Sequence, residues 1–328
     1  MKRRDFITLL GGAAAWPLAA RAQAGAVRRV GVLINGDESD PRSINNVASL
    51  TQVLRKLGWI EGQNLRMEVR WNAGDAERAR SLAGDLLRLS PDVVLAASTI
   101  NLAELLRRGP VMPIVFVLVS DPVEQGFVSN LARPGGNITG FSNYEFSIGG
   151  KWIELLKRMA PNLTHVTLVF NPGTSPQSQF FVRSIESAAP ALGVEPSAAP
   201  VHALADIERV IGTVSRRPNS GLIFPTDSFL SSHRQFVIES AAHFRVPAIY
   251  AGEEYTTAGG LMSYAVDYDN QFRQAAVYID RILRGGKPGE LPVQSPSKYS
   301  FVINLKTAKA LGIEVPTNLL LIADDYIE

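Results

Sequence analysis

Residues 92–121 read DVVLAASTINLAELLRRGPVMPIVFVLVSD. Residues 92–97 and 114–119 are apolar runs of strand length, and residues 100–108 between them have the length and pattern of a short helix. Uninterrupted apolar runs of this length are typical of strands buried on both faces, as in a parallel sheet covered by helices. The stretch therefore predicts a strand–helix–strand unit, the building block of an α/β fold.

The same alternation extends to both sides of this unit. Upstream we expect a strand at 30–34, a helix at 43–57 that Gly58 ends, a strand at 65–71 with one wet face, and a helix at 75–89. After a Pro-Gly-Gly-Asn cluster at 134–137 the alternation starts again. Downstream of it we expect helices at 148–159, 177–192, 204–215, 231–244 and 270–283 and strands at 166–170, 221–224, 248–250 and 261–266.

The length of the chain, 328 residues, exceeds what one compact core usually holds. We therefore predict an α/β fold of two Rossmann-like lobes, each a parallel sheet with helices on both faces. The strand and loop at 92–99 are echoed at 221–227. An internal duplication and the general likeness of strand–helix–strand units explain this echo equally well.

The first 24 residues have the features of an export signal. A Lys-Arg-Arg-Asp-Phe-Ile motif at 2–7 resembles a twin-arginine pattern, and a short apolar run at 8–20 precedes Ala22-Gln23-Ala24. The alternative is a membrane anchor, but the run is shorter than the about 20 apolar residues that span a bilayer. We expect cleavage after Ala24 and a protein that is free in the periplasm, without direct insertion in the membrane.

Charge and cysteine content exclude several classes of function. Removal of the signal leaves 29 basic and 30 acidic residues, a net charge of −1. Such a balance gives no electrostatic footprint for nucleic acid or an anionic membrane. The absence of cysteine excludes thiol catalysis, thiolate metal sites, disulfides and a lipid-modified N-terminal cysteine.

Sequence motifs for cofactors and catalysis are also missing. The segment after the strand at 30–34 holds one glycine and two acids instead of the glycine pattern of a dinucleotide site. The four histidines show no ligand spacing, and no Gly-x-Ser-x-Gly elbow occurs. We therefore expect no cofactor, no metal and no catalytic residue.

A ligand site is predicted from the position of polar loops. Ligands of open α/β sheets bind beyond the carboxyl ends of the strands, where helix N-termini offer free amides. This rule selects Asn35, Ser98, Thr99, Ser120, Asp121, Asn171, Thr226, Asp227, Tyr250 and Asp267. Such residues are also ordinary helix N-caps, so capping and ligand contact carry equal weight for Ser98, Thr99, Ser120 and Asp121.

Asp227 is the sharpest candidate among them. It follows an apolar strand, and its carboxylate could pair with a ligand ammonium opposite the amides of Ser98 and Thr99. This polarity fits an amino acid. Aromatic residues near the same loops, which could stack on a ligand side chain or belong to the core, are Phe141, Tyr144, Phe146, Phe229, Tyr250 and Tyr255.

Six stretches together resemble ABC transporter substrate-binding proteins of the tryptophan- and tyrosine-binding kind. They are LGWIEG at 57–62, PIVF at 113–116, SDPV at 120–123, RPGGNITG at 133–140, FNP at 170–172 and NLKTAKALG at 304–312. Pro225-Thr226-Asp227 also matches a family feature, which supports Asp227 as the ammonium partner. The missing lipoprotein cysteine and the individual residues before 43–57 leave the ligand's identity open.

The resemblance implies a type I periplasmic-binding-protein fold with a hinge of several crossings. With crossings near 140, 255 and 297, residues 27–139 plus 255–296 form one lobe and residues 140–254 plus 297–328 the other. The alternative is a tail that simply caps the second lobe. The implied function is the solute-binding component of an ABC importer, a monomer that takes a small organic solute, with aromatic amino acids favoured, and delivers it to an inner-membrane ABC permease.

Two other classes remain open at this point. One is an exported α/β enzyme with Asp121 or Asp227 as general base, which requires a second positioned group that the sequence does not show. The other is a solute sensor that docks on a membrane partner.

Overall fold

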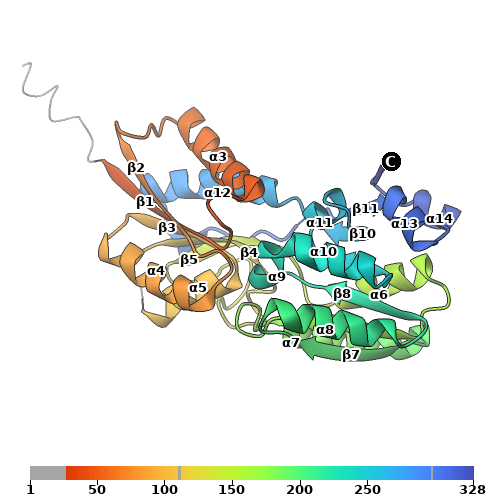
Figure 1. Cartoon of the computed structure of the whole chain (residues 1–328). Helices are drawn as coiled ribbons and strands as arrows, with labels where there is room; N and C mark the ends of the chain where they lie inside the picture. Colours follow the sequence, from red (N-terminus) through yellow and green to blue (C-terminus); the bar gives the residue numbers. More distant parts are fainter. Residues whose placement is uncertain (1–26, 110–111, 297) are drawn as a thin grey trace, which may run out of the picture.

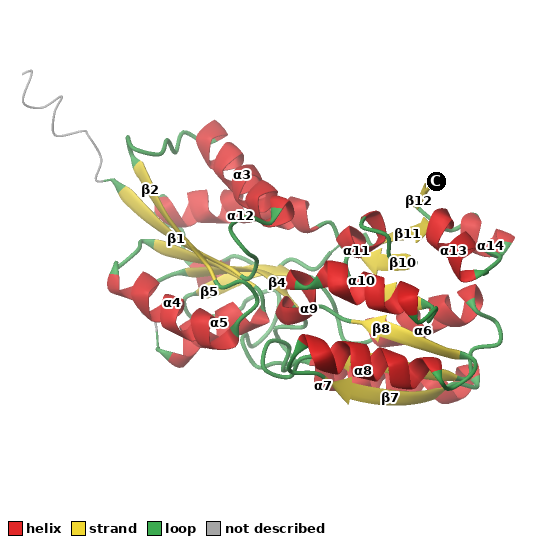
Figure 2. Ribbon diagram, in the orientation of Figure 1, coloured by secondary structure: helices red, strands yellow, loops and turns green. Residues whose placement is uncertain are grey.

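The computed structural model describes residues 27–109, 112–296 and 298–328 and shows two α/β lobes (Figure 1). The predicted export signal lies outside these residues. The fold class is confirmed, because each lobe is built on a mostly parallel sheet flanked by helices (Figure 2).

The first lobe contains a five-stranded sheet in the order β2-β1-β3-β4-β5, with all neighbours parallel. Its strands are β1 (Arg28–Ile34), β2 (Leu65–Trp71), β3 (Val93–Ala97), β4 (Ile114–Val119) and β5 (Ile138–Ser142). Its helices are α3 (Pro41–Lys56), α4 (Ala76–Arg88), α5 (Thr99–Arg107) and α12 (Tyr268–Leu283).

Successive residues of the first lobe's strands face two separate cores. Val30 and Val32 of β1 pack with α3 and α12 on one face of the sheet. Leu33 of the same strand packs with α4 and α5 on the other. Since helices cover both faces, the central strands β3 and β4 are apolar throughout, which is why they stand out in the sequence.

The second lobe contains a seven-stranded sheet in the order β12-β11-β10-β9-β8-β6-β7. Its strands are β6 (His165–Phe170), β7 (Glu195–Pro200), β8 (Ser220–Phe224), β9 (Ala248–Tyr250), β10 (Met262–Ala265), β11 (Ser300–Asn304) and β12 (Asp325–Ile327). Its helices are α6 (Ile148–Met159), α7 (Ser178–Ala188), α8 (Leu204–Ser215), α9 (Ser228–Ser232), α10 (Arg234–His243), α11 (Glu253–Thr257), α13 (Leu305–Leu311) and α14 (Thr317–Leu320). The β10–β11 pair is antiparallel, while the other neighbouring strands run parallel.

The sequence analysis placed residues 255–296 in the first lobe, and for β10 this prediction is wrong. Met262 pairs with Ile249 of β9 and with Ile303 of β11, so residues 262–265 belong to the sheet of the second lobe. The chain passes to the first lobe only after β10, where α12 packs against α3 (Figure 1). A four-residue strand carries no local signal for the sheet that it joins, because its partners are distant in sequence.

Candidate ligand-binding site

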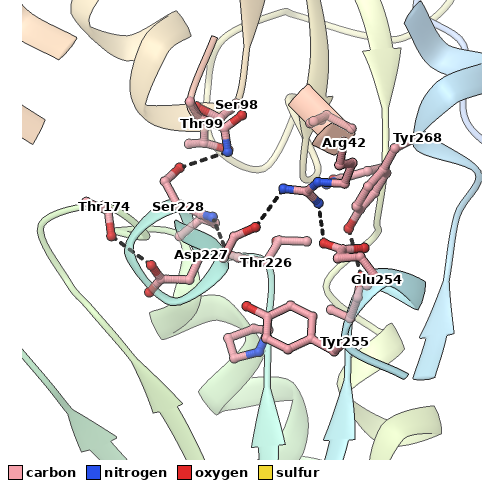
Figure 3. A pocket seen from close by; sticks show the side chains of 18 residues that line it. Arg42, Ser98, Thr99, Thr174, Thr226, Asp227, Ser228, Glu254, Tyr255 and Tyr268 are labelled. Carbon is pink, nitrogen blue, oxygen red and sulfur yellow. Dashed lines mark hydrogen bonds and ion pairs between the residues drawn. The ribbon is translucent and has the colours of Figure 1, made fainter. Parts of the chain in front are cut away.

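The two lobes enclose a cavity at the carboxyl ends of their strands (Figure 3). Most of the residues in its wall carry polar side-chain groups, and they come from both lobes: Asn35, Arg42, Ser98, Thr99, Leu118, Asn143, Thr174, Gln177, Pro225, Thr226, Asp227, Ser228, Ser231, Ala251, Gly252, Glu254, Tyr255 and Tyr268. The volume is about 40 Å³, while a cavity that takes benzene measures about 150 Å³. Side chains or lobes must therefore move before an amino acid fits.

Ser98 and Thr99 form the first-lobe wall at the start of α5. The Ser98 side chain caps the helix by accepting from the backbone amide of Asn101, 3.5 Å away. Ser98 has a φ of 108°, a conformation that costs a non-glycine residue about 1–3 kcal/mol and that is found at ligand sites. Capping and placement at the cavity thus coincide in this residue.

Asp227 organises the second-lobe wall. Its Oδ1 accepts hydrogen bonds from Thr174 Oγ1 (2.8 Å) and the amides of Phe229 (2.8 Å) and Leu230 (3.2 Å). Its Oδ2 accepts from the amide of Asn171 at 2.5 Å. The carboxylate is thereby engaged by four donors and caps α9. Its role as ammonium partner stays a prediction that this geometry does not support; the structure gives it a positioning role.

Burial raises the pKa of Asp227 to about 6, and its hydrogen bonds offset part of that rise. The side chain is fully enclosed by protein, which disfavours the charged form. The four donors favour the charged form, since each points at a carboxylate oxygen. Asp227 bonds to Thr174 and anchors the loop in which Thr226 and Ser228 flank it, so it positions three cavity-lining residues.

A charged pair that the sequence analysis missed spans the cavity. Arg42 in the first turn of α3 forms an ion pair with Glu254 in the first turn of α11, from the opposite lobe (Figure 3). A second cross-lobe pair joins Asp40 to Arg234 at 2.7 Å. A usable signal existed, because Arg42 and Glu254 lie just beyond the loops after β1 and β9 that the topology rule selects.

Three aromatic rings stack in a row that ends at the cavity. Phe224 lies parallel to Tyr250 at 5.2 Å between ring centroids, and Tyr250 lies parallel to Tyr255 at 4.8 Å. Tyr250, predicted as a ligand contact, is the buried middle ring and does not line the cavity. Tyr255 is the end of the row that lines the cavity wall (Figure 3).

Four other predicted site residues lie away from the cavity wall. Phe141 packs on Tyr278 in the first-lobe core, 4.8 Å between centroids. Asp267 is an exposed cap of α12. Asp121 accepts from the amide of Glu124 in its own loop. The backbone amide of Asn171 donates to the Asp227 carboxylate, and the Asn171 side chain accepts from the amide of Gly173.

Ser120 connects the lobes instead of lining the cavity. Its buried hydroxyl lies 2.9 Å from Asn143 Oδ1 and 3.4 Å from Thr226 Oγ1. Asn35 makes a similar contact, donating from Nδ2 to Ser228 Oγ at 3.4 Å, and it does line the cavity. Of the residues that the topology rule selected, five line the cavity: Asn35, Ser98, Thr99, Thr226 and Asp227.

Several buried polar atoms on this wall have no hydrogen-bond partner among the described residues. They are Arg42 Nε, Thr99 Oγ1, Asn143 Nδ2, Gln177 Oε1 and Tyr255 OH. A buried polar atom without a partner costs about 1–3 kcal/mol. Donors and acceptors concentrated on one cavity in this way are what a polar ligand would satisfy.

Gly74 provides a test of the close approach of the lobes. Its φ is +73°, and a Cβ there would lie 2.5 Å from the carbonyl oxygen of Ser228 and 2.6 Å from Ser232 Oγ in the other lobe. We expect Gly74→Ala to hold the lobes apart and to weaken ligand binding by at least about tenfold, since the closed state becomes less populated. In the presence of ligand, small-angle X-ray scattering should give a larger radius of gyration for Gly74→Ala than for the wild type.

Gly62→Ala is the matched control for Gly74→Ala. Gly62 has a similar φ of +79°, and no described atom lies within 4 Å of the position of a Cβ. Gly62→Ala carries the same cost of a positive φ, but its added methyl group contacts no described atom, so the affinity of this variant for the ligand should equal that of the wild type. Equal binding by both variants would show that Gly74 does not limit closure.

The described residues carry no sign of a metal site or a membrane span. They hold no group of three or more histidine, aspartate or glutamate side chains placed to bind a metal ion. Among their helices, none combines the length and the apolar character that crossing a membrane requires.

A polar cavity enclosed between two α/β lobes defines a two-lobed solute-binding protein. Residues 30–327 match the ABC transporter substrate binding protein family, and the chain belongs to this family. The resemblance seen in the sequence is confirmed. Members of the family bind small molecules and normally work with ABC permeases; they are binding proteins rather than enzymes.

Individual relatives agree with this assignment. The chain is 26% identical over 263 residues to a tyrosine-binding protein of Clostridioides difficile, covering 80% of this chain and 75% of that protein. It is similar to a conserved domain protein of Vibrio cholerae, with 27% identity and a TM-score of 0.84 over 92% of this chain and 100% of that one. An ABC domain from Streptococcus pneumoniae in complex with L-Trp has the same fold, with 23% identity, a TM-score of 0.81 and the same coverage.

Proposed function

We propose that this protein is the periplasmic solute-binding component of an ABC importer and that its ligand is an amino acid, with aromatic ones favoured. The observation that carries the proposal is the set of unpartnered polar atoms on the wall of the cavity between the lobes. Binding would satisfy these atoms from both lobes at once. It would thereby favour the closed arrangement, which the permease recognises.

Three features support an amino acid over a sugar or a simple acid. Arg42 and Glu254 on the wall carry opposite charges, which suit a ligand with both charges. Tyr255 ends a row of stacked rings at the cavity, where an aromatic side chain would extend the stack. The C. difficile relative is a tyrosine-binding protein, and the S. pneumoniae structure holds L-Trp.

Roles for the wall residues follow from their positions. Asn35, Ser98, Thr99 and Thr226 would contact the ligand directly. Ser120 and Asp227 would act behind them, by joining the lobes and by fixing the loop at 225–228. Export by the twin-arginine signal at 1–24, a monomeric state and delivery to an inner-membrane permease complete the proposal.

The proposal predicts that an aromatic amino acid stabilises the protein. Thermal-shift and calorimetric screens of L-tryptophan, L-tyrosine, other amino acids, aromatic acids and sugars test it. A ligand at 100 times its Kd stabilises the folded state by about 2.7 kcal/mol, enough for a shift of several degrees. A response to sugars with none to any amino acid would contradict it.

A further inference from the structure

The Arg42–Glu254 ion pair lies in the space that the charged head group of a ligand would need. Each residue stands in the first turn of its helix, and the two come from opposite lobes (Figure 3). Their side chains are mostly shielded, with 21% and 15% of the surface exposed. The cavity beside them holds only about 40 Å³, so the wall must open to admit an amino acid, and parting of the lobes would separate this cross-lobe pair.

Neighbouring residues position the side chains of Arg42 and Glu254 at the cavity. Arg42 Nη2 donates to Ser231 Oγ at 2.7 Å, while Nε makes no hydrogen bond to the described residues and lies 3.9 Å from Asp40 Oδ2. Glu254 folds back over Gly252, where an added Cβ would lie 2.5 Å from Oε2. Asp40, the other carboxylate near Arg42, is committed to Arg234 at 2.7 Å and to Ser43 at 2.9 Å.

A shielded ion pair resists being broken on one side only. Removing one partner leaves the other charge without compensation, which costs more than the pair itself contributes. A ligand with one charge would neutralise only one of the two residues. A ligand with both charges can replace each partner by its own group, so that neither residue is left uncompensated.

We propose that the Arg42–Glu254 pair selects zwitterions by this exchange, with the ligand carboxylate bound by Arg42 and its ammonium bound by Glu254. The proposal rests on the proposed function and deepens it. It replaces Asp227, whose carboxylate is already engaged by four donors, as the acidic partner of the ligand. Polar solutes without charge leave the pair intact and bind weakly.

The test compares three ligands that share one ring system: L-tryptophan, tryptamine, which lacks the carboxylate, and indole-3-propionate, which lacks the ammonium. If L-tyrosine is the better ligand, tyramine and 4-hydroxyphenylpropionate replace them. For the wild type, calorimetry should give an affinity for the zwitterion at least about 30-fold above that of either analogue. Equal affinity for the three ligands would overturn the proposal.

Two variants should change the preference instead of only lowering affinity. Glu254→Gln removes the negative charge that binds the ammonium. The variant's affinity for tryptophan should therefore fall by at least about 30-fold, while its affinity for indole-3-propionate should exceed that of the wild type. Arg42→Gln should shift in the opposite direction, toward tryptamine. A gain of affinity for an analogue cannot result from misfolding.

Arg234→Gln is the matched control, because it breaks the other cross-lobe pair at a residue that does not itself line the cavity. It should weaken the three ligands alike and keep their order. The proposal is overturned if Glu254→Gln and Arg42→Gln behave in the same way as this control. A wild type that binds no amino acid overturns the proposed function as well, whereas tryptophan binding with unchanged preferences in both variants overturns only the exchange.

Discussion

Asp227→Ala is expected to abolish measurable ligand binding and to lower the free energy of unfolding by about 2–4 kcal/mol. The substitution leaves four donors, Thr174 Oγ1 and the amides of Asn171, Phe229 and Leu230, without their shared acceptor in a buried setting. The loop that carries Thr226 and Ser228 to the cavity then loses its anchor. Calorimetric titration and urea denaturation measure the two effects.

Asp206→Ala in the same lobe is the control for this variant. Asp206 also accepts two backbone amides, those of His202 and Ala203, but at an exposed helix start far along the sequence from the cavity residues. Its loss should cost about 1 kcal/mol and leave binding unchanged. An Asp227→Ala protein that binds as the wild type does would refute the positioning role.

The pH dependence of stability offers a second check on Asp227. Its folded pKa of about 6 exceeds the ordinary value of 3.8, so the folded state takes up a proton more readily than the unfolded state. The contribution of this group to stability is therefore complete below pH 3.8 and is lost as the pH rises through 6. The difference in the free energy of unfolding between the wild type and Asp227→Ala should change between pH 3.8 and 6 and level off above pH 6.

Trp152→Ala should produce the largest loss of stability, about 3–5 kcal/mol. Trp152 is fully buried in the second-lobe core, its ring 5.6 Å from Tyr144 and 5.1 Å from Phe181, and its Nε1 donates to the carbonyl oxygen of Tyr264 at 3.2 Å. Alanine leaves a large cavity that rigid neighbours cannot fill. Urea denaturation followed by circular dichroism measures the change.

Trp59→Phe in the first lobe is the comparison for Trp152→Ala. Trp59 is only partly buried, and phenylalanine keeps most of its ring while losing the 2.8 Å bond from Nε1 to Asp280. The expected loss is about 1 kcal/mol. A Trp152→Ala protein with the stability of Trp59→Phe would mean that the second-lobe core repacks freely around the missing ring.

The sequence predicts the strands that stand out as long apolar or alternating runs, including the edge strand β2, but it misses the short strands β5 and β11 and the edge strand β7. β3, β4 and β8 are uninterrupted apolar runs, because helices cover both of their faces. β7 (Glu195–Pro200) was missed, because it is a partly exposed edge strand of small residues and two prolines that shows no such run. β10 was recognised as a strand, but its partners lie in segments that only the folded chain brings together.

The candidate site was predictable to the extent that topology alone determines it. Ser98, Thr99 and Thr226 follow strand ends, and parallel strands bring their carboxyl ends to one edge. The topology rule points to the loops beside Arg42 and Glu254, but these residues are 212 positions apart, so the sequence does not show that they pair. Asp227 was placed at the right loop, and its role as ammonium partner stays a prediction; the amides that surround its carboxylate come from the fold around it and could not be read from the sequence.

The packing of α12 on α3 has a consequence for how the chain matures on the ribosome. The core beneath the first sheet is completed by Phe272, Tyr278 and Ile279, although the strands of that sheet end at Ser142. The nascent amino-terminal half thus emerges with an apolar face that α3 covers only in part until the segment from β6 to β10 of the second lobe and then α12 have been synthesised. Translation must pass residue 283 before the first lobe can be finished, which makes the earlier intermediates natural clients for a holding chaperone.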